Sequence, residues 1–144
     1  MRMINRLFTT ANNLKTNCFL FFLLVCSLFV GQQEGWGQCT KGNYWSSKTA
    51  PTNCNNVYLS TGYIYAGEYS TITNVVSGTS YDSESTGGNG NFITILNSSN
   101  VAVASGISPI TWTASSSGTF YQQINTNSSC GTENVGRVST IKVS

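Results

Sequence analysis

The sequence predicts an all-β fold, an antiparallel β-sandwich that follows an N-terminal signal helix. Downstream of residue 56, short runs of β-branched and aromatic residues alternate with turns of Gly, Ser and Asn, as is typical of an antiparallel sandwich or barrel. No segment of this region shows the 3.6-residue apolar periodicity of an amphipathic helix. Alternating apolar side chains place one face of each strand in a core between two sheets, which favours the sandwich.

Residues 1–37 are predicted to form a secretory signal peptide. Basic residues precede the unbroken apolar run CFLFFLLVCSLFV at 18–30, which is shorter than the roughly 20 residues that cross a bilayer, and small residues follow it. We expect cleavage before Gln38, with a cut nearer Gly31 as the alternative, and no stable membrane span afterwards. An uncleaved membrane anchor and a lipoprotein attached at Cys26 are the other two interpretations.

The remaining residues, 38–144, have the length of a single β-sandwich domain. Four basic residues balance four acidic residues there, so the net charge of +2 of the whole chain comes from the signal segment. A neutral surface rich in Ser, Thr, Asn and Gly is typical of extracellular β-proteins, and it offers no basic patch to nucleic acid or anionic lipid. The sequence therefore predicts no nucleic-acid partner.

The N-terminal half of this domain begins with a turn-rich segment at 38–56, which we predict to be an irregular lead-in. VYLSTGYIYA at 57–66 contains short β-prone runs. EYSTITNV at 68–75 is a β-branched and aromatic strand that ends in a Ser-Gly turn. TSYDSES at 79–85 continues the pattern, and STGGNGN at 85–91 is a flexible loop.

The C-terminal half contains the strongest strand signal, NFITIL at 91–96, which VAVAS at 101–105 follows as the second half of a hairpin. PITWTA at 109–114, TFYQQINT at 119–126 and RVSTIKV at 137–143 are the remaining strands. Alternation along these strands predicts the core residues. They are Ile93, Ile95, Val101, Val103, Ile110, Trp112, Ala114, Phe120, Ile124, Ile141 and Val143.

Three cysteines remain once the signal segment is removed: Cys39, Cys54 and Cys130. Export places them in an oxidising compartment. We predict a Cys39–Cys54 disulfide, which closes a loop of about 15 residues and contributes about 3 kcal/mol in the loop-entropy treatment. Cys130 is then left over, either buried as a small apolar residue or present as a free thiol.

Acid–base and metal chemistry have few candidate residues. The chain contains no histidine, which excludes Ser-His-Asp and Cys-His sites and removes the commonest metal ligand. Asp82 and Glu84 alternate on one strand about 7 Å apart, within the roughly 5–9 Å of a glycosidase pair. A solvated strand edge explains them better, and with Glu68 they lack the spacing of a calcium loop. We therefore expect no catalytic residue, no cofactor and no metal site.

Aromatic residues are the one enriched chemical resource of the domain. Exposed Tyr and Trp beside Asn and Gln stack on sugar rings or anchor protein partners. We assign Trp112, Phe120 and Tyr69 mainly to the core. The candidate ligand-binding residues are Tyr44 and Trp45 in the lead-in, and Tyr63 and Tyr65, which alternate on one face.

Three phrases follow one another in the domain: YAGEYSTITNVVSGTSY at 65–81, NFITILNSSNVAVASG at 91–106 and SPITWTASSSGTFYQQINTNSSCGT at 108–132. With the cysteines of the lead-in, this order resembles a repeated secreted module of Bacteroidetes surface proteins, which is similar to the bacterial pre-peptidase C-terminal domains. The resemblance covers nearly all of 38–144. It implies a jelly-roll-like β-sandwich that accompanies secreted peptidases and adhesins.

The chain departs from that pattern after Cys130, where the last strands carry no further cysteine, so the second disulfide that the resemblance implies has no partner. A C-terminal sorting domain is also expected in such proteins. We expect the chain to be either a free-standing protein or a fragment of a larger secreted peptidase or adhesin.

These observations favour an exported, non-catalytic β-sandwich module for adhesion, substrate binding or spacing at the bacterial cell surface. We expect it to be secreted or attached to the surface, with an extracellular glycan or protein as its partner. The alternative is a carbohydrate-binding domain that uses Tyr44, Trp45, Tyr63 and Tyr65.

Overall fold

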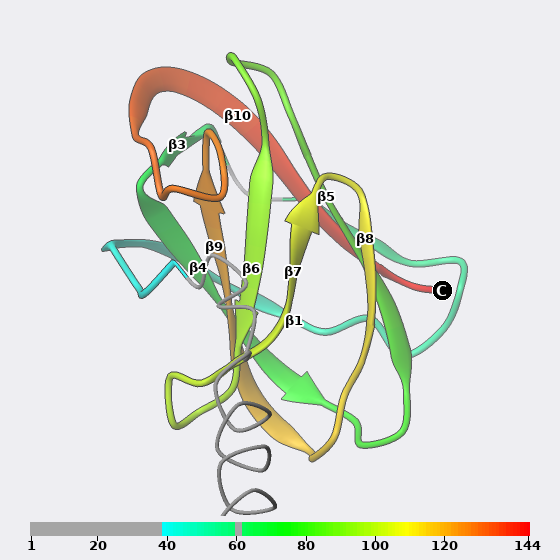
Figure 1. Ribbon diagram of the computed structural model, residues 1–144. Helices are drawn as coiled ribbons and strands as arrows, with labels where there is room; N and C mark the ends of the chain where they lie inside the picture. Colours follow the sequence, from blue (N-terminus) through cyan, green and yellow to red (C-terminus); the bar gives the residue numbers. More distant parts are fainter. Residues whose placement is uncertain (1–38, 60–61) are drawn as a thin grey trace, which may run out of the picture. The chain divides into compact units, whose positions relative to one another are not determined.

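The computed structural model describes residues 39–59 and 62–144 and confirms the all-β prediction (Figure 1). The predicted signal peptide, residues 1–37, lies outside the described residues. Within the described part no helix is long and apolar enough to cross a membrane. The strands there are β1 (Asn43–Thr49), β2 (Val57–Leu59), β3 (Ile64–Ala66), β4 (Glu68–Val75), β5 (Ser80–Thr86), β6 (Phe92–Leu96), β7 (Ala102–Ile107), β8 (Ile110–Thr113), β9 (Gly118–Asn125) and β10 (Glu133–Val143).

The strands form two sheets, which we call the first and the second sheet. The first has five strands in the order β1-β4-β9-β6-β7. The second has the order β2-β10-β5-β8, and β3 also pairs with the long strand β10. Neighbouring strands in the described part of the chain are antiparallel, except for β1 and β4, which run parallel. The predicted antiparallel sandwich is therefore confirmed, with a single parallel pair at one edge.

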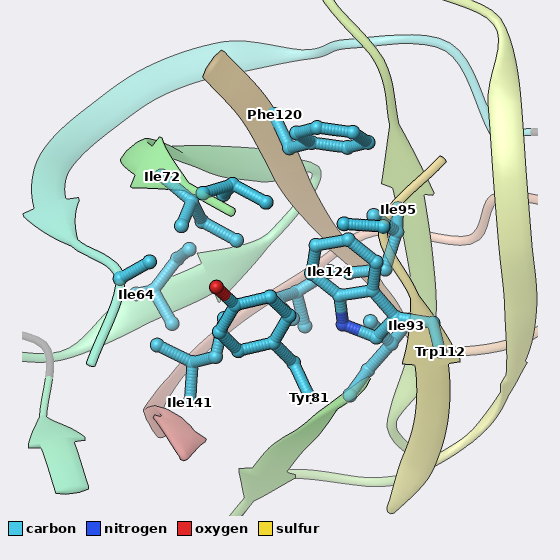
Figure 2. Packing of buried hydrophobic residues seen from close by; sticks show 12 residues of the cluster. Ile64, Ile72, Tyr81, Ile93, Ile95, Trp112, Phe120, Ile124 and Ile141 are labelled. Atoms are coloured by element: carbon cyan, nitrogen blue, oxygen red, sulfur yellow. The ribbon is translucent and has the colours of Figure 1, made fainter. Parts of the chain in front are cut away.

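The core lies between the two sheets, and its centre is a stack of three rings (Figure 2). Trp112 of β8 packs between Tyr81 of β5 and Phe120 of β9, with ring centroids 5.1 and 5.2 Å apart. The polar atoms of these rings are satisfied, as buried Tyr and Trp require. Trp112 Nε1 donates to Ser83 Oγ at 3.0 Å, and Tyr81 Oη accepts a hydrogen bond from the Val76 N–H.

Most of the predicted core residues are confirmed. Ile110 and Val143 are partly buried and pack against the central cluster. The fully buried ones are Ile93, Ile95, Trp112, Ala114, Phe120, Ile124 and Ile141.

Three residues expected in the core lie elsewhere. Val101 and Val103 are exposed. Val101 precedes β7, and the register of this edge strand shifts opposite Ile95 and Leu96, which leaves Val103 in a bulge. Tyr69 is only half-buried. It is out of phase with Ile72 on the same strand, so its ring points away from the space between the sheets.

The predicted irregular lead-in, 38–56, instead contains β1, so that prediction was wrong for residues 43–49. Polar residues such as Ser46, Ser47 and Lys48 carry little apolar periodicity, yet they form a strand because β4 supplies a backbone partner for each of them. An edge strand buries only part of its surface, so it needs fewer apolar residues than a central strand.

The start of β1 is fixed where the chain turns between β3 and β4. The Asn43 N–H donates to the Gly67 carbonyl at 3.1 Å, and the Gly67 N–H donates to the Ile124 carbonyl at 2.8 Å. Gly67 has φ of +104°, which favours glycine. A Cβ at Gly42 would overlap the Gly67 carbonyl oxygen, so this approach of β1 to the turn requires glycine there.

The disulfide joins Cys39 to Cys130, with the two Cα atoms 5.3 Å apart, and the predicted Cys39–Cys54 pair was wrong. Cys54 is an exposed free thiol. The cause is the route of the first residues, because the Gly42 N–H donates to the Gln123 side chain and holds this segment against β9. Cys130 follows the end of β9, so the fold brings these two cysteines together across 91 residues of sequence.

Candidate functional site

Three tyrosines form a row across the first sheet, which we call the tyrosine ladder: Tyr44 of β1, Tyr69 of β4 and Tyr121 of β9. Tyr44 is directly opposite Tyr69 in the strand pairing, and Tyr121 is opposite Thr71, one diagonal step away. The Tyr44 and Tyr69 ring centroids are 5.8 Å apart, and those of Tyr69 and Tyr121 are 5.7 Å apart. Both pairs are edge-to-face, the arrangement that aromatic quadrupoles favour.

A lysine covers one end of the tyrosine ladder. Lys41 Nζ lies 3.7 Å from the centroid of the Tyr121 ring and 5.2 Å from that of Tyr69, within the range of a cation–π interaction. The position of Lys41 follows from the anchoring of its neighbour Gly42 on Gln123. The ladder therefore combines flat apolar rings with a positive charge, while Tyr44 remains 59% exposed.

The second aromatic group is the Trp45–Tyr65 pair, whose ring centroids are 6.2 Å apart in an edge-to-face contact. Trp45 lies where the pairing of β1 with β4 shifts register, and such a bulge redirects a side chain. The Glu68 side chain holds the backbone of Tyr65, because its Oε2 accepts the Tyr65 N–H at 2.9 Å. Tyr44 and Trp45 are consecutive, so β1 connects this pair to the tyrosine ladder.

An open hollow of about 450 Å³ lies beside Tyr65, between the turn after β3 and the start of β10. Its lining is mostly polar. It is formed by Asn43, Tyr65, Ala66, Gly67, Glu68, Thr132, Glu133 and Asn134. The hollow continues the surface of the Trp45–Tyr65 pair and offers hydrogen-bonding groups next to an aromatic ring.

The four predicted binding residues are thus all on the surface, but they are not a single cluster. Tyr44 belongs to the tyrosine ladder, and Trp45 and Tyr65 contact each other. Tyr63 is 62% exposed and lies against Gly136 of β10, where an added Cβ would come within 2.8 Å of the tyrosine. Among the described residues, no ring contact joins Tyr63 to the other three.

Sequence reasoning missed Lys41 and Tyr121, and it assigned Tyr69 to the core. A signal was present in the strand alternation. Tyr121 is adjacent to the core residue Phe120 and therefore faces the opposite side. The same argument separates Tyr69 from Ile72, so strict use of the two-residue period would have found two members of the ladder.

The Asp82 carboxylate of the second sheet is held by two neighbouring side chains. Thr111 Oγ1 donates to Asp82 Oδ1 at 2.7 Å, and Lys142 Nζ lies 3.6 Å from Oδ2. The pKa of Asp82 is lowered below its usual value, mainly by the hydrogen bond from the Thr111 hydroxyl and to a smaller extent by the charge of Lys142. A general acid needs a raised pKa instead. No group of three His, Cys, Asp or Glu side chains in the part of the chain that is described has the geometry of a metal site.

A buried polar contact lies beneath the aromatic surface. Lys48 of β1 points between the sheets, and its Nζ donates to Gln122 Oε1 and to Ser139 Oγ, each at 3.0 Å. Burial lowers the pKa of Lys48 to about 7. This contact ties the strand that carries Tyr44 and Trp45 to both sheets.

The fold and the surface define a two-sheet β-sandwich domain with an aromatic face at one edge. Comparison with protein-family models and with curated proteins found no match. Among solved structures, the chain is similar to PliG, a periplasmic lysozyme inhibitor of g-type lysozyme, from Aeromonas hydrophila, with a TM-score of 0.53 and 10% sequence identity over 72% of this chain and 99% of that chain.

PliG from Salmonella Typhimurium matches with a TM-score of 0.46 and 12% identity over 72% of this chain and 100% of that chain. At such identities the likeness to the Aeromonas protein concerns the fold alone. The resemblance to Bacteroidetes modules and pre-peptidase C-terminal domains stays a prediction.

Proposed function

We propose that the chain is an exported, non-catalytic binding module that holds a partner protein on the tyrosine ladder and the Trp45–Tyr65 pair. The observation that carries the proposal is the ladder itself, three edge-to-face rings with Lys41 over one end. Tyr and Trp on a rigid scaffold are among the residues that dominate protein interfaces. The polar hollow beside Tyr65 supplies a rim of hydrogen-bonding groups.

Export is supported by the disulfide between Cys39 and Cys130, since such bonds persist in oxidising compartments. The Aeromonas neighbour is a periplasmic inhibitor of g-type lysozyme, which is consistent with a protein-binding role for this fold. Adhesion, substrate binding or spacing at a bacterial surface are the settings in which we place the module.

The experiment places a photoreactive phenylalanine analogue at Tyr44 of the exported protein and irradiates it in the extracellular fraction of the producing cells. A protein adduct of defined mass is expected. The matched control carries the analogue at Val76, which is also exposed and follows the last residue of β4. An adduct that forms equally from both positions would contradict the proposed site. Purified g-type lysozyme is tested in the same way as one candidate partner.

A glycan is the second candidate partner, because exposed Tyr44 and Trp45 also suit stacking on sugar rings. A glycan array separates the two. Binding to an array that Trp45→Ala abolishes, together with no protein adduct at Tyr44, would replace the protein partner by a carbohydrate. Absence of both an adduct and array binding would remove this surface as the functional site.

A further inference from the structure

A second surface lies at the opposite edge of the first sheet, away from the aromatic face. The strand order places β1 at one end of that sheet and β7 at the other, as Figure 1 shows with β7 beside β6. No strand in the described ranges pairs with the outer side of β7. Such an edge presents backbone N–H and C=O groups that can pair with another strand.

The groups that face this open edge can be assigned from the pairing with β6. The Ser108 N–H donates to the Asn91 carbonyl at 2.8 Å. Because hydrogen-bonded and non-hydrogen-bonded pairs alternate in an antiparallel ladder, Gly106 and Ala104 bond toward β6. The N–H and C=O groups of Ser105 and Ile107 therefore point outward.

The β1 and β7 edges differ in their protection. β1 carries the inward-pointing Lys48 and a register shift at Trp45, both of which discourage the addition of a strand. β7 has a bulge at Val103 but no charged residue. The charge-free region extends well beyond β7, since residues 85–132 contain no Asp, Glu, Lys or Arg.

Apolar side chains accompany the open backbone. Ile107 is 79% exposed, and Val101 and Val103 are also exposed. A hollow of about 260 Å³ opens at the end of β7. It is lined by Phe92 and Ile107 with Gly90, Asn91, Thr126, Asn127 and Ser128, and its surface is mainly apolar. Edge-strand recognition combines backbone hydrogen bonds with such side-chain pockets.

We propose that β7 is a dimerisation edge, occupied by β7 of a second copy of this chain. The segment that fits the edge must be extended and uncharged and must carry exposed apolar side chains, and β7 with its flanking Val101 has these properties itself. Antiparallel pairing of two identical edges about a two-fold axis is self-complementary and closes at two copies. The like-charge repulsion that would oppose this pairing is missing, because neither edge carries a charge.

The geometry has a consequence for the aromatic surface. Pairing at β7 joins two five-stranded sheets into one continuous sheet, with a β1 edge at each outer end. The two tyrosine ladders then lie far apart and remain open. Such a dimer presents two binding surfaces at once, which raises the apparent affinity for a partner with repeated sites.

The test is sedimentation of the exported protein across a concentration series, with Cys54→Ser in every sample so that no intermolecular disulfide forms. We expect a dimer that dissociates on dilution. Val103→Lys places a lysine from each copy at the paired edge and should weaken association roughly a hundredfold. The matched control is Val76→Lys, another exposed valine, far from β7, and it should leave association unchanged.

Amide hydrogen exchange gives a second readout of pairing at β7. It uses the native β7 sequence, so it does not depend on the folding of a variant. The amides of Ser105 and Ile107 should exchange more slowly as the concentration rises. A monomer at every concentration would overturn the proposal, and so would a dimer in which these two amides are not protected. Capture of a different protein at β7 by a monomeric chain would likewise overturn pairing with a second copy. None of these outcomes bears on the proposed binding at Tyr44, which the crosslinking experiment tests separately.

Discussion

Lys48 Nζ lies 3.0 Å from Gln122 Oε1, inside the sandwich and with no charged hydrogen-bond partner among the described residues. The second acceptor of this amine in the part of the chain that the structure describes is the Ser139 hydroxyl. Burial of a charge without an opposite charge is costly, and it lowers the pKa of Lys48 from 10.5 to about 7. The contact positions β1, but the protein gives up stability to keep a lysine there.

We expect Lys48→Met to raise the free energy of unfolding at pH 7 by about 1–3 kcal/mol. Methionine fills a similar volume without a charge, so its burial avoids the desolvation of the amine. We expect this gain in stability to exceed the loss of the hydrogen bonds to Gln122 and Ser139. Urea denaturation measures the change. The control is Lys142→Met, an exposed lysine 3.6 Å from Asp82, which should change stability by less than about 0.5 kcal/mol. A marked loss of stability in Lys48→Met would mean that the hydrogen bonds outweigh the desolvation of the amine.

The same lysine makes stability depend on pH in one direction. Between pH 7 and 10.5 the unfolded chain holds a proton on Lys48 that the folded chain has lost, so unfolding takes up a proton and stability rises with pH. Below pH 7 the lysine is protonated in both states and its contribution is constant. The urea midpoint of the native chain should therefore be higher at pH 9 than at pH 7. The same difference should be smaller in Lys48→Met. Equal slopes for the two proteins would show that Lys48 titrates normally.

Strand positions could be predicted from the sequence because the two-residue alternation and the turn residues are local signals. NFITIL predicted β6, and the core positions Ile93 and Ile95 are both buried. The parallel pairing of β1 could not be predicted in this way. Its residues lack apolar alternation, and the strand exists because β4 provides a backbone partner far along the chain.

The binding surface was predictable only in part. Exposed aromatics in a polar segment indicated Tyr44 and Trp45, whereas the contacts of Tyr44 with Tyr69, and of Lys41 with Tyr121, depend on strand register. The disulfide was mispredicted for a related reason. Sequence proximity favoured a short loop, but the path of residues 39–42 over the end of β9 decides the partner of Cys39.

The Cys39–Cys130 disulfide should contribute strongly to stability, because it closes a loop across 91 residues of sequence. We expect Cys130→Ser, made in a Cys54→Ser background, to lower the free energy of unfolding by about 3–4 kcal/mol. The control is Cys54→Ser alone, which removes an exposed thiol and should leave stability unchanged. Peptide mapping of the unreduced protein gives an independent check. A fragment that links Cys39 to Cys54 would contradict the pairing.

Arg137 is fully buried and should hold the 87–91 loop to β10. Its guanidinium donates to Asn91 Oδ1 and to the Gly90 and Val135 carbonyls, and it pairs with Glu133. We expect Arg137→Met to lower stability by about 3 kcal/mol, because these acceptors lose their donor. Hydrogen exchange should also accelerate in the 87–91 loop. A loss of stability without faster exchange there would show that Arg137 acts elsewhere.

The tyrosine ladder should be an ordered surface before any partner arrives. Tyr69 is its central ring and contacts Tyr44, Tyr121 and the Lys41 ammonium. In a double-mutant cycle, Tyr69→Ala and Tyr121→Ala should show a coupling energy of about 0.5–1.5 kcal/mol, which is the range for edge-to-face pairs. The matched cycle pairs Tyr69→Ala with Tyr63→Ala, since Tyr63 is an exposed tyrosine without a described ring contact to the ladder.

We expect no coupling in that second cycle, because residues without shared contacts change stability additively. Coupling in the first cycle alone means that packing within the protein fixes the rings and that a partner does not have to order them. A rigid aromatic surface loses little conformational entropy on binding, which increases affinity without adding contacts. If both cycles are additive, the rings are independently mobile, and the ladder then acts as an adaptable surface that the partner must arrange.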